Sequence, residues 1–411
     1  MSTKWPGGII SKTAPTITAP TAGVGGSASG IWTMDEVLVH EKASNWPKPP
    51  FGGELWTWGE AGSGQLGDGS TVDKSSPVQV GSLTNWSSVS AGDSHMLALK
   101  PDGTAWAQGA NQYGQLGDGN TTNLSSPVQI GTLTNWEQVS CANWCSYGIK
   151  TDGTLWAWGY AVAGALGQGN TTSHSSPVQV GSLTNWLTVV GTYFGFLAIK
   201  TDGTMWGCGS NSYGQLGDGS TTSRSSPVQI GALTTWAQCS GYWAHGGAVK
   251  TDGTLWMWGR NVKGRLGNGN TTANSSPVQI GSLTNWKYIS VGNKHSVSVK
   301  TDGTLWSWGD AFNGGLGNGN AATDISSPAQ VGSLTDWAEL PESMSVAQNN
   351  ALKTDGTLWA WGNEGSGALG QGNTTAYSSP VQIGSLTTWV AKDENKRRFT
   401  KGHKTMAGIK T

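Results

Sequence analysis

Charged residues are scarce in this chain of 411 residues, at 12% of the sequence, with 24 Lys and Arg against 25 Asp and Glu. Soluble domains typically have about twice that share, so the composition argues against a charged disordered chain and against a coiled coil. The formal net charge is −1. The chain therefore has no overall attraction to nucleic acid or to an anionic membrane, and we expect neither nucleic-acid binding nor membrane insertion.

Long apolar runs are also missing. The longest run near the start is Ile9-Ile10, which is much shorter than the apolar core of a signal peptide. No later segment approaches the about 18 apolar residues of a membrane span. We therefore expect no signal peptide and no transmembrane segment.

Cysteine occurs only four times, at Cys141, Cys145, Cys208 and Cys239. Each copy stands where other repeats of the chain carry other residue types; Cys239, for example, stands where Val89 stands. We interpret the four as small buried apolar residues. The alternative, a redox or metal pair of Cys141 and Cys145, lacks a histidine at ligand spacing.

Glycine and tryptophan, by contrast, are abundant, with 63 and 24 copies. So many tryptophans imply a large buried apolar area, which means that the chain folds and that most of them are structural. They belong to an internal repeat of about 50 residues, which carries the motif Leu-Trp-x-Trp-Gly or a variant and ends on a further tryptophan. The first tryptophans of the seven units are Trp56, Trp106, Trp156, Trp206, Trp256, Trp306 and Trp359.

Each unit is predicted to contain four short antiparallel strands. In one copy, the strands span residues 136–140, 148–150, 154–158 and 178–180. The Asp-Gly pair between the second and third strands is typical of a hairpin with a type I′ turn. A long Gly-rich loop, 160–175, precedes the fourth strand. A unit of this length and strand number is the size of a propeller blade.

The two ends of the chain indicate how a ring of such units closes. Residues 402–411 align with 92–101 and stop where an Asp-Gly turn should follow, whereas the first repeat begins at 52–56, where that turn should end. One blade is therefore split between the two ends, and pairing them removes the exposed edges of an open array. The sequence predicts an all-β, seven-bladed propeller over residues 51–411, preceded by an extended arm, 1–50.

The long loops carry the clearest signature. Residues 111–119 (NQYGQLGDG) and 211–219 (NSYGQLGDG), each behind a Trp-x-x-Gly segment, resemble the repeats of the regulator of chromosome condensation family. The resemblance covers residues 51–411 and implies a seven-bladed propeller. It says little about function, because propellers host many functions.

The turn after the first strand and the loop after the third should share one face of the ring, because successive turns of an antiparallel blade alternate between the faces. Residues on this face differ between repeats, Tyr160, Arg260 and Asp310 among them, whereas the opposite face is nearly invariant. Variable aromatic residues at loop tips are typical of a surface that contacts a protein or a carbohydrate. The alternative is that the rings turn inward and plug the central channel. The predicted partner-binding residues are Trp144, Tyr193, Phe194, Tyr242, Trp243, Tyr113, Tyr213, Lys263 and Phe312.

Two further groups of residues need an interpretation. His95, His245 and His295 fall on the variable face, and we interpret them as structural hydrogen-bonding residues, with a metal site as the alternative. The seventh blade has an inserted basic loop, which is either a solvated surface loop or a contact for an anionic partner. Its cations are Lys392, Lys396, Arg397 and Arg398.

Residues 1–50 lack the repeat. A short helix is predicted at 35–43, entered at Thr33 with Glu36 completing a capping box. The segment resembles short N-terminal modules that precede binding domains in virion proteins of tailed bacteriophages, especially marine ones; a generic disordered leader is the alternative. The resemblance implies a virion anchor made by Ile9, Ile10, Ile31, Trp32 and Trp46.

No catalytic constellation stands out, because the sequence has no nucleophile elbow, no related pair of carboxylates and no phosphate-binding loop before a helix. We therefore predict a protein that is not an enzyme and needs no cofactor. The first hypothesis is a phage structural protein (fibre, appendage or capsid decoration) that is assembled in the host cytoplasm and located in the virion. Its arm would bind other virion proteins and its variable face a host-surface glycan or protein.

The alternative is a regulatory protein-binding propeller, of the nucleotide-exchange or enzyme-inhibitor type. A light sensor is a third hypothesis. Residues 241–245 depart at three of five positions from the Gly-Trp-Arg-His-Thr repeats of plant ultraviolet-B photoreceptors, which argues against it.

Overall fold

The computed structural model describes residues 52–342, 348–363, 365–389, 399–401 and 405–410, together with two short stretches, 17–18 and 27–28. The chain divides into two compact units, Met1–Gly52 and Gly53–Thr411. In the first unit, β1 (Ile17–Thr18) pairs antiparallel with β2 (Ser27–Ala28).

Three predictions lie outside the described residues. They are the helix at 35–43, the anchor residues Ile9, Ile10, Ile31, Trp32 and Trp46, and the basic loop with Lys392, Lys396, Arg397 and Arg398.

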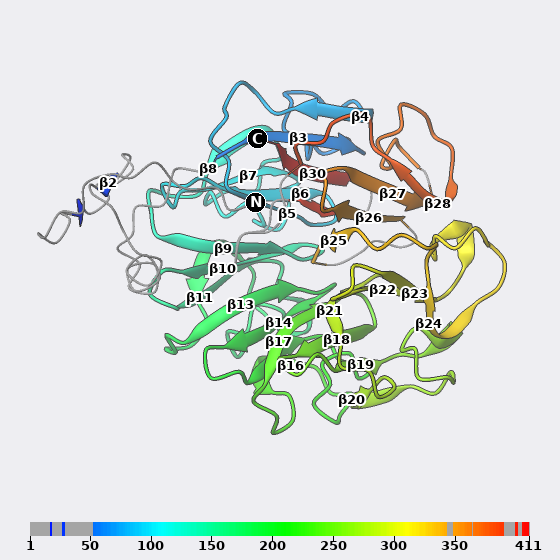
Figure 1. The fold of residues 1–411 in the computed structure, drawn as a ribbon. Coiled ribbons are helices and arrows are strands. Elements are labelled where there is room, and N and C mark those ends of the chain that lie inside the picture. Colours follow the sequence, from blue (N-terminus) through cyan, green and yellow to red (C-terminus); the bar gives the residue numbers. More distant parts are fainter. Residues whose placement is uncertain are drawn as a thin grey trace, which may run out of the picture. The chain divides into compact units, whose positions relative to one another are not determined.

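The second unit consists of seven antiparallel four-stranded sheets (Figure 1), which confirms the predicted all-β, seven-bladed propeller. We number the blades 1 to 7. Blade 1 comprises β29 (Phe399–Lys401), β30 (Thr405–Lys410), β3 (Glu54–Gly59) and β4 (Lys74–Gln79). Blade 2 comprises β5 (Ser88–Ala91), β6 (His95–Leu99), β7 (Ala105–Gly109) and β8 (Leu124–Gln129). Blade 3 comprises β9 (Trp136–Cys141), β10 (Cys145–Lys150), β11 (Leu155–Gly159) and β12 (His174–Gln179).

The remaining blades repeat this order. Blade 4 comprises β13 (Trp186–Gly191), β14 (Gly195–Lys200), β15 (Met205–Gly209) and β16 (Arg224–Gln229). Blade 5 comprises β17 (Trp236–Gly241), β18 (His245–Lys250), β19 (Leu255–Gly259) and β20 (Asn274–Gln279). Blade 6 comprises β21 (Trp286–Val291), β22 (His295–Lys300), β23 (Leu305–Gly309) and β24 (Ile325–Gln330). Blade 7 comprises β25 (Trp337–Glu339), β26 (Gln348–Lys353), β27 (Leu358–Gly362) and β28 (Tyr377–Gln382). Three 3-10 helices, η1 (Val162–Gly164), η2 (Val262–Gly264) and η3 (Phe312–Gly314), lie in the long loops of blades 3, 5 and 6.

Blade 1 is split between the two ends of the chain, as predicted. β30 pairs antiparallel with β3, from Glu54 opposite Lys410 to Gly59 opposite Thr405. Figure 1 shows the red β30 beside the blue β3. The Lys410 ammonium also lies 3.6 Å from the Glu54 carboxylate. The C-terminal strands thus cover the edge that β3 would otherwise expose.

The first strand of each blade is the innermost. The N–H of Cys141 in β9 donates to Ser90 Oγ in β5, and the N–H of Gly191 in β13 donates to Ser140 Oγ in β9, each at 2.9 Å. The fourth strands lie on the rim, are partly exposed and carry Ser-Ser-Pro. A rim strand tolerates proline because its free side needs no hydrogen-bond donor. Because this pattern is polar, the sequence predicted the strand only at 178–180, whereas the strand begins at His174.

The Asp-Gly segments form hairpins, but the turn is not of the predicted type I′. In blade 3, the N–H of Gly153 donates to the carbonyl oxygen of Lys150 at 2.8 Å, and Gly153 has a φ of 75°. Asp152 is not among the residues with positive φ, and its carboxylate accepts hydrogen bonds from the N–H and the hydroxyl of Thr154, at 3.0 and 2.6 Å. The loop is therefore a type I turn followed by a left-handed glycine.

Indole rings fill the space between blades. Trp158 of blade 3 is fully buried in one cluster with Leu97 and Leu99 of blade 2. Its Nε1–H donates to the carbonyl oxygen of Gln115 in the long loop of blade 2, at 3.0 Å. Such rings link four of the blades to the preceding loop, as expected for structural tryptophans. The same kind of bond is made by Trp258, Trp308 and Trp361.

The four cysteines are buried and form no disulfide, in agreement with their interpretation as small buried residues. The thiol of Cys141 donates to the carbonyl oxygen of Ser90 at 3.2 Å. Burial raises the pKa of the Cys145 thiol to about 12, so it stays protonated at neutral pH.

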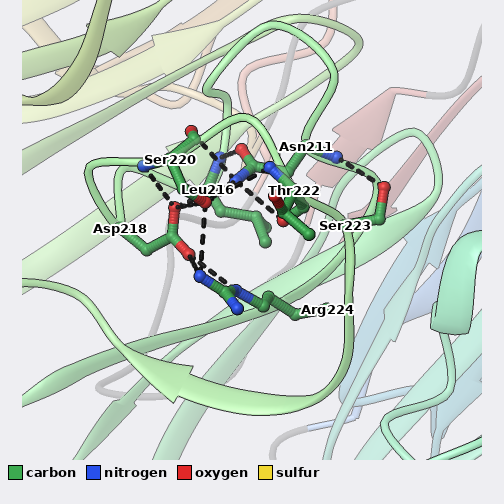
Figure 2. A network of polar contacts seen from close by, with 7 residues as sticks. All are labelled: Asn211, Leu216, Asp218, Ser220, Thr222, Ser223 and Arg224. Atoms are coloured by element: carbon green, nitrogen blue, oxygen red, sulfur yellow. Dashed lines mark hydrogen bonds and ion pairs between the residues drawn. The ribbon is translucent and has the colours of Figure 1, made fainter.

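In three blades the long loop is held from inside by one asparagine, Asn111, Asn211 or Asn261, and Figure 2 shows the loop of Asn211. Asn211 Oδ1 accepts a hydrogen bond from the N–H of Leu216 at 3.0 Å, and Nδ2 donates to Asp218 Oδ1 at 2.9 Å and to two loop carbonyl oxygens at 3.1 and 3.2 Å. Asp218 in turn pairs with Arg224 at 2.7 Å. The loop backbone therefore does not depend on its outward-facing side chains, which are free to differ between blades.

Candidate binding surface

The turn after the first strand and the long loop after the third lie on one face of each blade, as predicted, and we call it the loop face. In blade 3, the N–H of Tyr160 donates to the carbonyl oxygen of Trp144 at 3.0 Å; in blade 5, that of Arg260 donates to Ala244 at 2.8 Å. The Asp-Gly turns and the links between blades share the opposite face, the connection face. A constant backbone frame thus carries variable side chains.

At several junctions between blades, three positions of the loop face meet. A long-loop residue of one blade meets a residue of the first turn and a residue at the base of the long loop in the next blade. The three described sets are Tyr113, Trp144 and Tyr160 between blades 2 and 3; Tyr213, Trp243 and Arg260 between blades 4 and 5; and Lys263, Lys294 and Asp310 between blades 5 and 6.

The first set is aromatic. The ring centroids of Tyr113 and Tyr160 are 4.4 Å apart, and the Trp144 ring lies 5.2 Å from Tyr113 and 5.8 Å from Tyr160. Trp144 also contacts Phe194 of blade 4 at 5.6 Å. All four rings are half-buried.

The contacts continue inward from Phe194. Tyr193 lies 4.4 Å from Phe194 and 6.1 Å from Tyr242 of blade 5, between ring centroids. Burial raises the pKa of both tyrosines, and the carboxylate of Asp93 in blade 2 raises each further. A blade 2 carboxylate near tyrosines of blades 4 and 5 places these two rings toward the middle of the ring of blades. We call the six residues Tyr113, Trp144, Tyr160, Phe194, Tyr193 and Tyr242 the aromatic cluster.

Trp243 does not join the aromatic cluster, although the sequence placed it in the same patch. Its ring lies 5.7 Å from that of Tyr213, which is 41% exposed. The Arg260 guanidinium carbon stands 4.8 Å from the Tyr213 ring centroid and 5.4 Å from that of Trp243. We call these three residues the Arg260 cluster.

The third set is ionic. Lys263 is exposed and pairs with Asp324 at 2.6 Å, while Lys294 pairs loosely with Asp310 at 3.9 Å. Phe312 is 55% exposed, and the Lys294 ammonium lies 5.3 Å from its ring centroid. Of the predicted partner-binding residues, Lys263 and Phe312 therefore belong to a different surface from the aromatic cluster.

The histidines take part in links between blades. His95 Nε2 lies 2.9 Å from Ser146 Oγ, and the Ser146 hydroxyl donates to the carbonyl oxygen of Gln115 at 2.7 Å, so Nε2 must be the donor to Ser146. His245 repeats the contact with Ser296 at 3.1 Å. These contacts support the structural interpretation. Across the described residues, no group of three or more His, Cys, Asp and Glu side chains is placed to hold a metal ion.

Glu342 is a residue that sequence reasoning missed. It follows β25 of blade 7, and its carboxylate accepts a hydrogen bond from Ser140 of blade 3. The signal was the break in the repeat at this point, where Pro341 replaces the serine found as Ser90, Ser140 and Ser240 in other inner strands.

A separate groove, with a volume of about 370 Å³, lies between blades 5 and 6 and is lined by Leu283, Trp286 and Trp306 among others. It contains none of the predicted partner-binding residues. In the described part of the chain, no helix has the length and apolar character needed to cross a bilayer.

These features define a seven-bladed β-propeller with a variable loop face. Segments 52–99, 102–149, 152–194, 202–249, 252–299 and 355–392 match the regulator of chromosome condensation (RCC1) repeat, and 86–115 and 286–314 match a second repeat model of the same description. The matches cover more than half of the chain, which therefore belongs to the RCC1 repeat family.

Solved structures share the fold at low sequence identity. Human WBSCR16 is 19% identical with a TM-score of 0.77, and the match covers 87% of this chain and 98% of that one. Prp20p from Saccharomyces cerevisiae is 18% identical with a TM-score of 0.76, covering 88% and 92%. Yeast RCC1 (Prp20) bound by Kap60 is 18% identical with a TM-score of 0.74, covering 88% and 89%.

Proposed function

We propose that this chain is a regulatory, protein-binding propeller and that the loop face is its contact surface. The aromatic cluster carries the proposal, because six half-buried rings from four consecutive blades form one chain of contacts. Aromatic rings that are already held in place lose little conformational entropy on binding, and Trp and Tyr are enriched among the residues that dominate interface energies.

Similar propellers support a protein as the ligand. The Prp20p structure was described together with its binding to Gsp1p and histones, and the same yeast protein has been solved bound to Kap60. Those ligands are proteins, which favours a protein over a glycan as the partner of this chain. We propose a role of the nucleotide-exchange or enzyme-inhibitor type, without an active site or a cofactor.

The test compares the immobilised full chain with two variants. Trp144→Ala removes the ring that contacts three others, and Leu183→Ala, on the connection face and 45% exposed, is the matched control. A partner captured by the wild type is purified and its Kd is measured by calorimetry. We expect Trp144→Ala to weaken binding at least about tenfold, the size of one interface hot spot, and Leu183→Ala to bind normally. Unchanged binding by a folded Trp144→Ala variant would contradict the proposal.

Display on a phage particle is the second candidate. One observation favours it: the propeller begins at Gly53, whose N–H donates to the carbonyl oxygen of Trp86 at 2.9 Å on the connection face. The first residue of the propeller therefore lies on the face opposite the proposed receptor-binding surface. Mass spectrometry of purified virions tests this candidate, and a chain absent from the particles would rule it out.

A further inference from the structure

Among the residues that the structure describes, Arg260 is a cation of the loop face whose side-chain donors are still available. It is half-buried, and two rings flank its guanidinium group at 4.8 and 5.4 Å. A cation–π contact restricts the position of a guanidinium group but leaves its N–H donors available for hydrogen bonds. In the part of the chain that the structure describes, no carboxylate pairs with Arg260 and its side chain donates no hydrogen bond.

The neighbouring cations are already engaged. Lys263 pairs with Asp324 and Lys294 with Asp310. Arg265 is buried, and its Nε and Nη1 donate to two backbone carbonyl oxygens at 3.0 and 2.8 Å. The junction between blades 4 and 5 therefore combines one available cation, held between two side chains of the Arg260 cluster, with an exposed aromatic ring.

We propose that the Arg260 cluster binds an acidic side chain of the partner protein, next to an apolar side chain that packs on Tyr213 and Trp243. The proposal rests on the proposed function and specifies the chemistry of the partner at this junction. A guanidinium group presents two parallel donors that match the two oxygens of a carboxylate. The exposed Tyr213 ring supplies apolar contact area beside that pair.

The same observations disfavour nucleic acid as the ligand. Binding to a nucleic acid draws its strength from several phosphate contacts at once. At the next junction, between blades 5 and 6, Lys263 and Lys294 are neutralised by Asp324 and Asp310, whose carboxylates would also repel a run of phosphates. A single carboxylate suits this site better than a polyanion.

Two synthetic peptides test the proposal with the full chain. The first is a fluorescein-labelled, acetylated peptide with glutamates on both sides of a central tryptophan; the second has glutamine at each glutamate position. Fluorescence anisotropy gives both dissociation constants. We expect the glutamate peptide to bind at least about tenfold more tightly, as for a charge-assisted, hydrogen-bonded pair. Equal affinities would overturn the proposal.

Variants assign the preference to Arg260. Arg260→Gln should abolish the preference for the glutamate peptide. Arg260→Lys should retain only part of that preference, because lysine lacks the planar pair of donors. Tyr213→Ala should weaken the binding of both peptides alike. Lys287→Gln is the matched control, since it removes one positive charge from an exposed position on β21. If Lys287→Gln lowers the preference as much as Arg260→Gln, the effect is one of net charge, and the proposal fails.

Three further outcomes are separable. A labelled thymidine oligonucleotide that bound more tightly than the glutamate peptide, with a steep salt dependence, would overturn the proposal in favour of nucleic acid. If the protein binds the two peptides equally while Trp144→Ala still abolishes capture of the partner protein, this inference fails and the proposed function stands. If the peptide preference depends on Arg260 but Trp144→Ala leaves capture unchanged, the aromatic cluster is not the contact surface.

Discussion

Ser140 donates one hydrogen bond that is shared by both carboxylate oxygens of Glu342, each at 3.1 Å. Ser140 belongs to the inner strand of blade 3, and Glu342 follows the inner strand of blade 7. The backbone carbonyl oxygen of Glu342 accepts a second bond, from Ser240 Oγ of blade 5, at 2.6 Å. Glu342 therefore links three blades that are not neighbours in the ring.

Glu342→Ala should destabilise the propeller, because it leaves the buried Ser140 hydroxyl without its acceptor. We expect the free energy of unfolding in urea to fall by about 1–3 kcal/mol. A double-mutant cycle with Ser140→Ala should reveal coupling, whereas a cycle with Ser240→Ala should be nearly additive, since that bond goes to the backbone. Additivity in both cycles would contradict the link.

Removing residues 402–411 should cost far more than a typical point substitution, which destabilises by about 1 kcal/mol. The deletion takes away β30, which pairs with β3 along its whole length, and opens the ring. Thermal melting measures the effect, with deletion of residues 1–50 as the control. A truncated chain with an unchanged melting temperature would disprove ring closure by this strand.

The stability of the propeller should fall as the pH drops below neutral. Burial lowers the pKa of His95 to about 3 and that of His295 to about 4, both below the value of 6.5 expected in the unfolded chain. The unfolded state therefore takes up the protons, and the stability contributed by each residue is complete above about pH 6.5 and is lost toward pH 4. Linkage gives a loss of about 2 kcal/mol per histidine between pH 7 and 5.

Urea unfolding at several pH values measures the slope of the free energy of unfolding against pH. His95→Gln should flatten it, because glutamine occupies the equivalent position in blade 7, as Gln348 opposite Gly362, and does not titrate. His174→Gln, at a partly exposed site on the rim strand β12, is the control. The same slope in wild type and His95→Gln would contradict a buried neutral His95.

Asn211→Asp should destabilise blade 4 more than Asn211→Ala. The aspartate would keep the acceptor for Leu216 but would set a second carboxylate against Asp218 and two carbonyl oxygens, where the amide now donates. Alanine occurs naturally at this position in other blades, as Ala61, Ala161 and Ala311. We expect losses of about 1 kcal/mol for alanine and about 3 kcal/mol for aspartate in urea unfolding at pH 7. The opposite order would contradict the donor role of the Asn211 amide.

The local backbone was predictable wherever a residue type has one dominant preference. Asp-Gly marked the hairpins correctly, but the turn type was wrong, because the Asp152 carboxylate bonds to Thr154 and only Gly153 takes positive φ. The rim strand β12 began earlier than predicted, since Ser-Ser-Pro does not alternate in hydrophobicity. Such misses arise where side-chain hydrogen bonds or position in the sheet override the local pattern.

The sequence by itself determined the number of blades, the split of blade 1 and the variable face, because all three follow from a repeat period and from where it starts and stops. Only the tertiary structure decided which loop residues meet. Trp144 and Trp243 look alike in sequence, yet Trp144 joins the aromatic cluster and Trp243 contacts Tyr213 and Arg260. The hydrogen bond from Ser140 to Glu342 could not be predicted from the sequence either. Contacts between blades depend on distances of a few ångströms across the ring, and the spacing of residues along the chain does not give those distances.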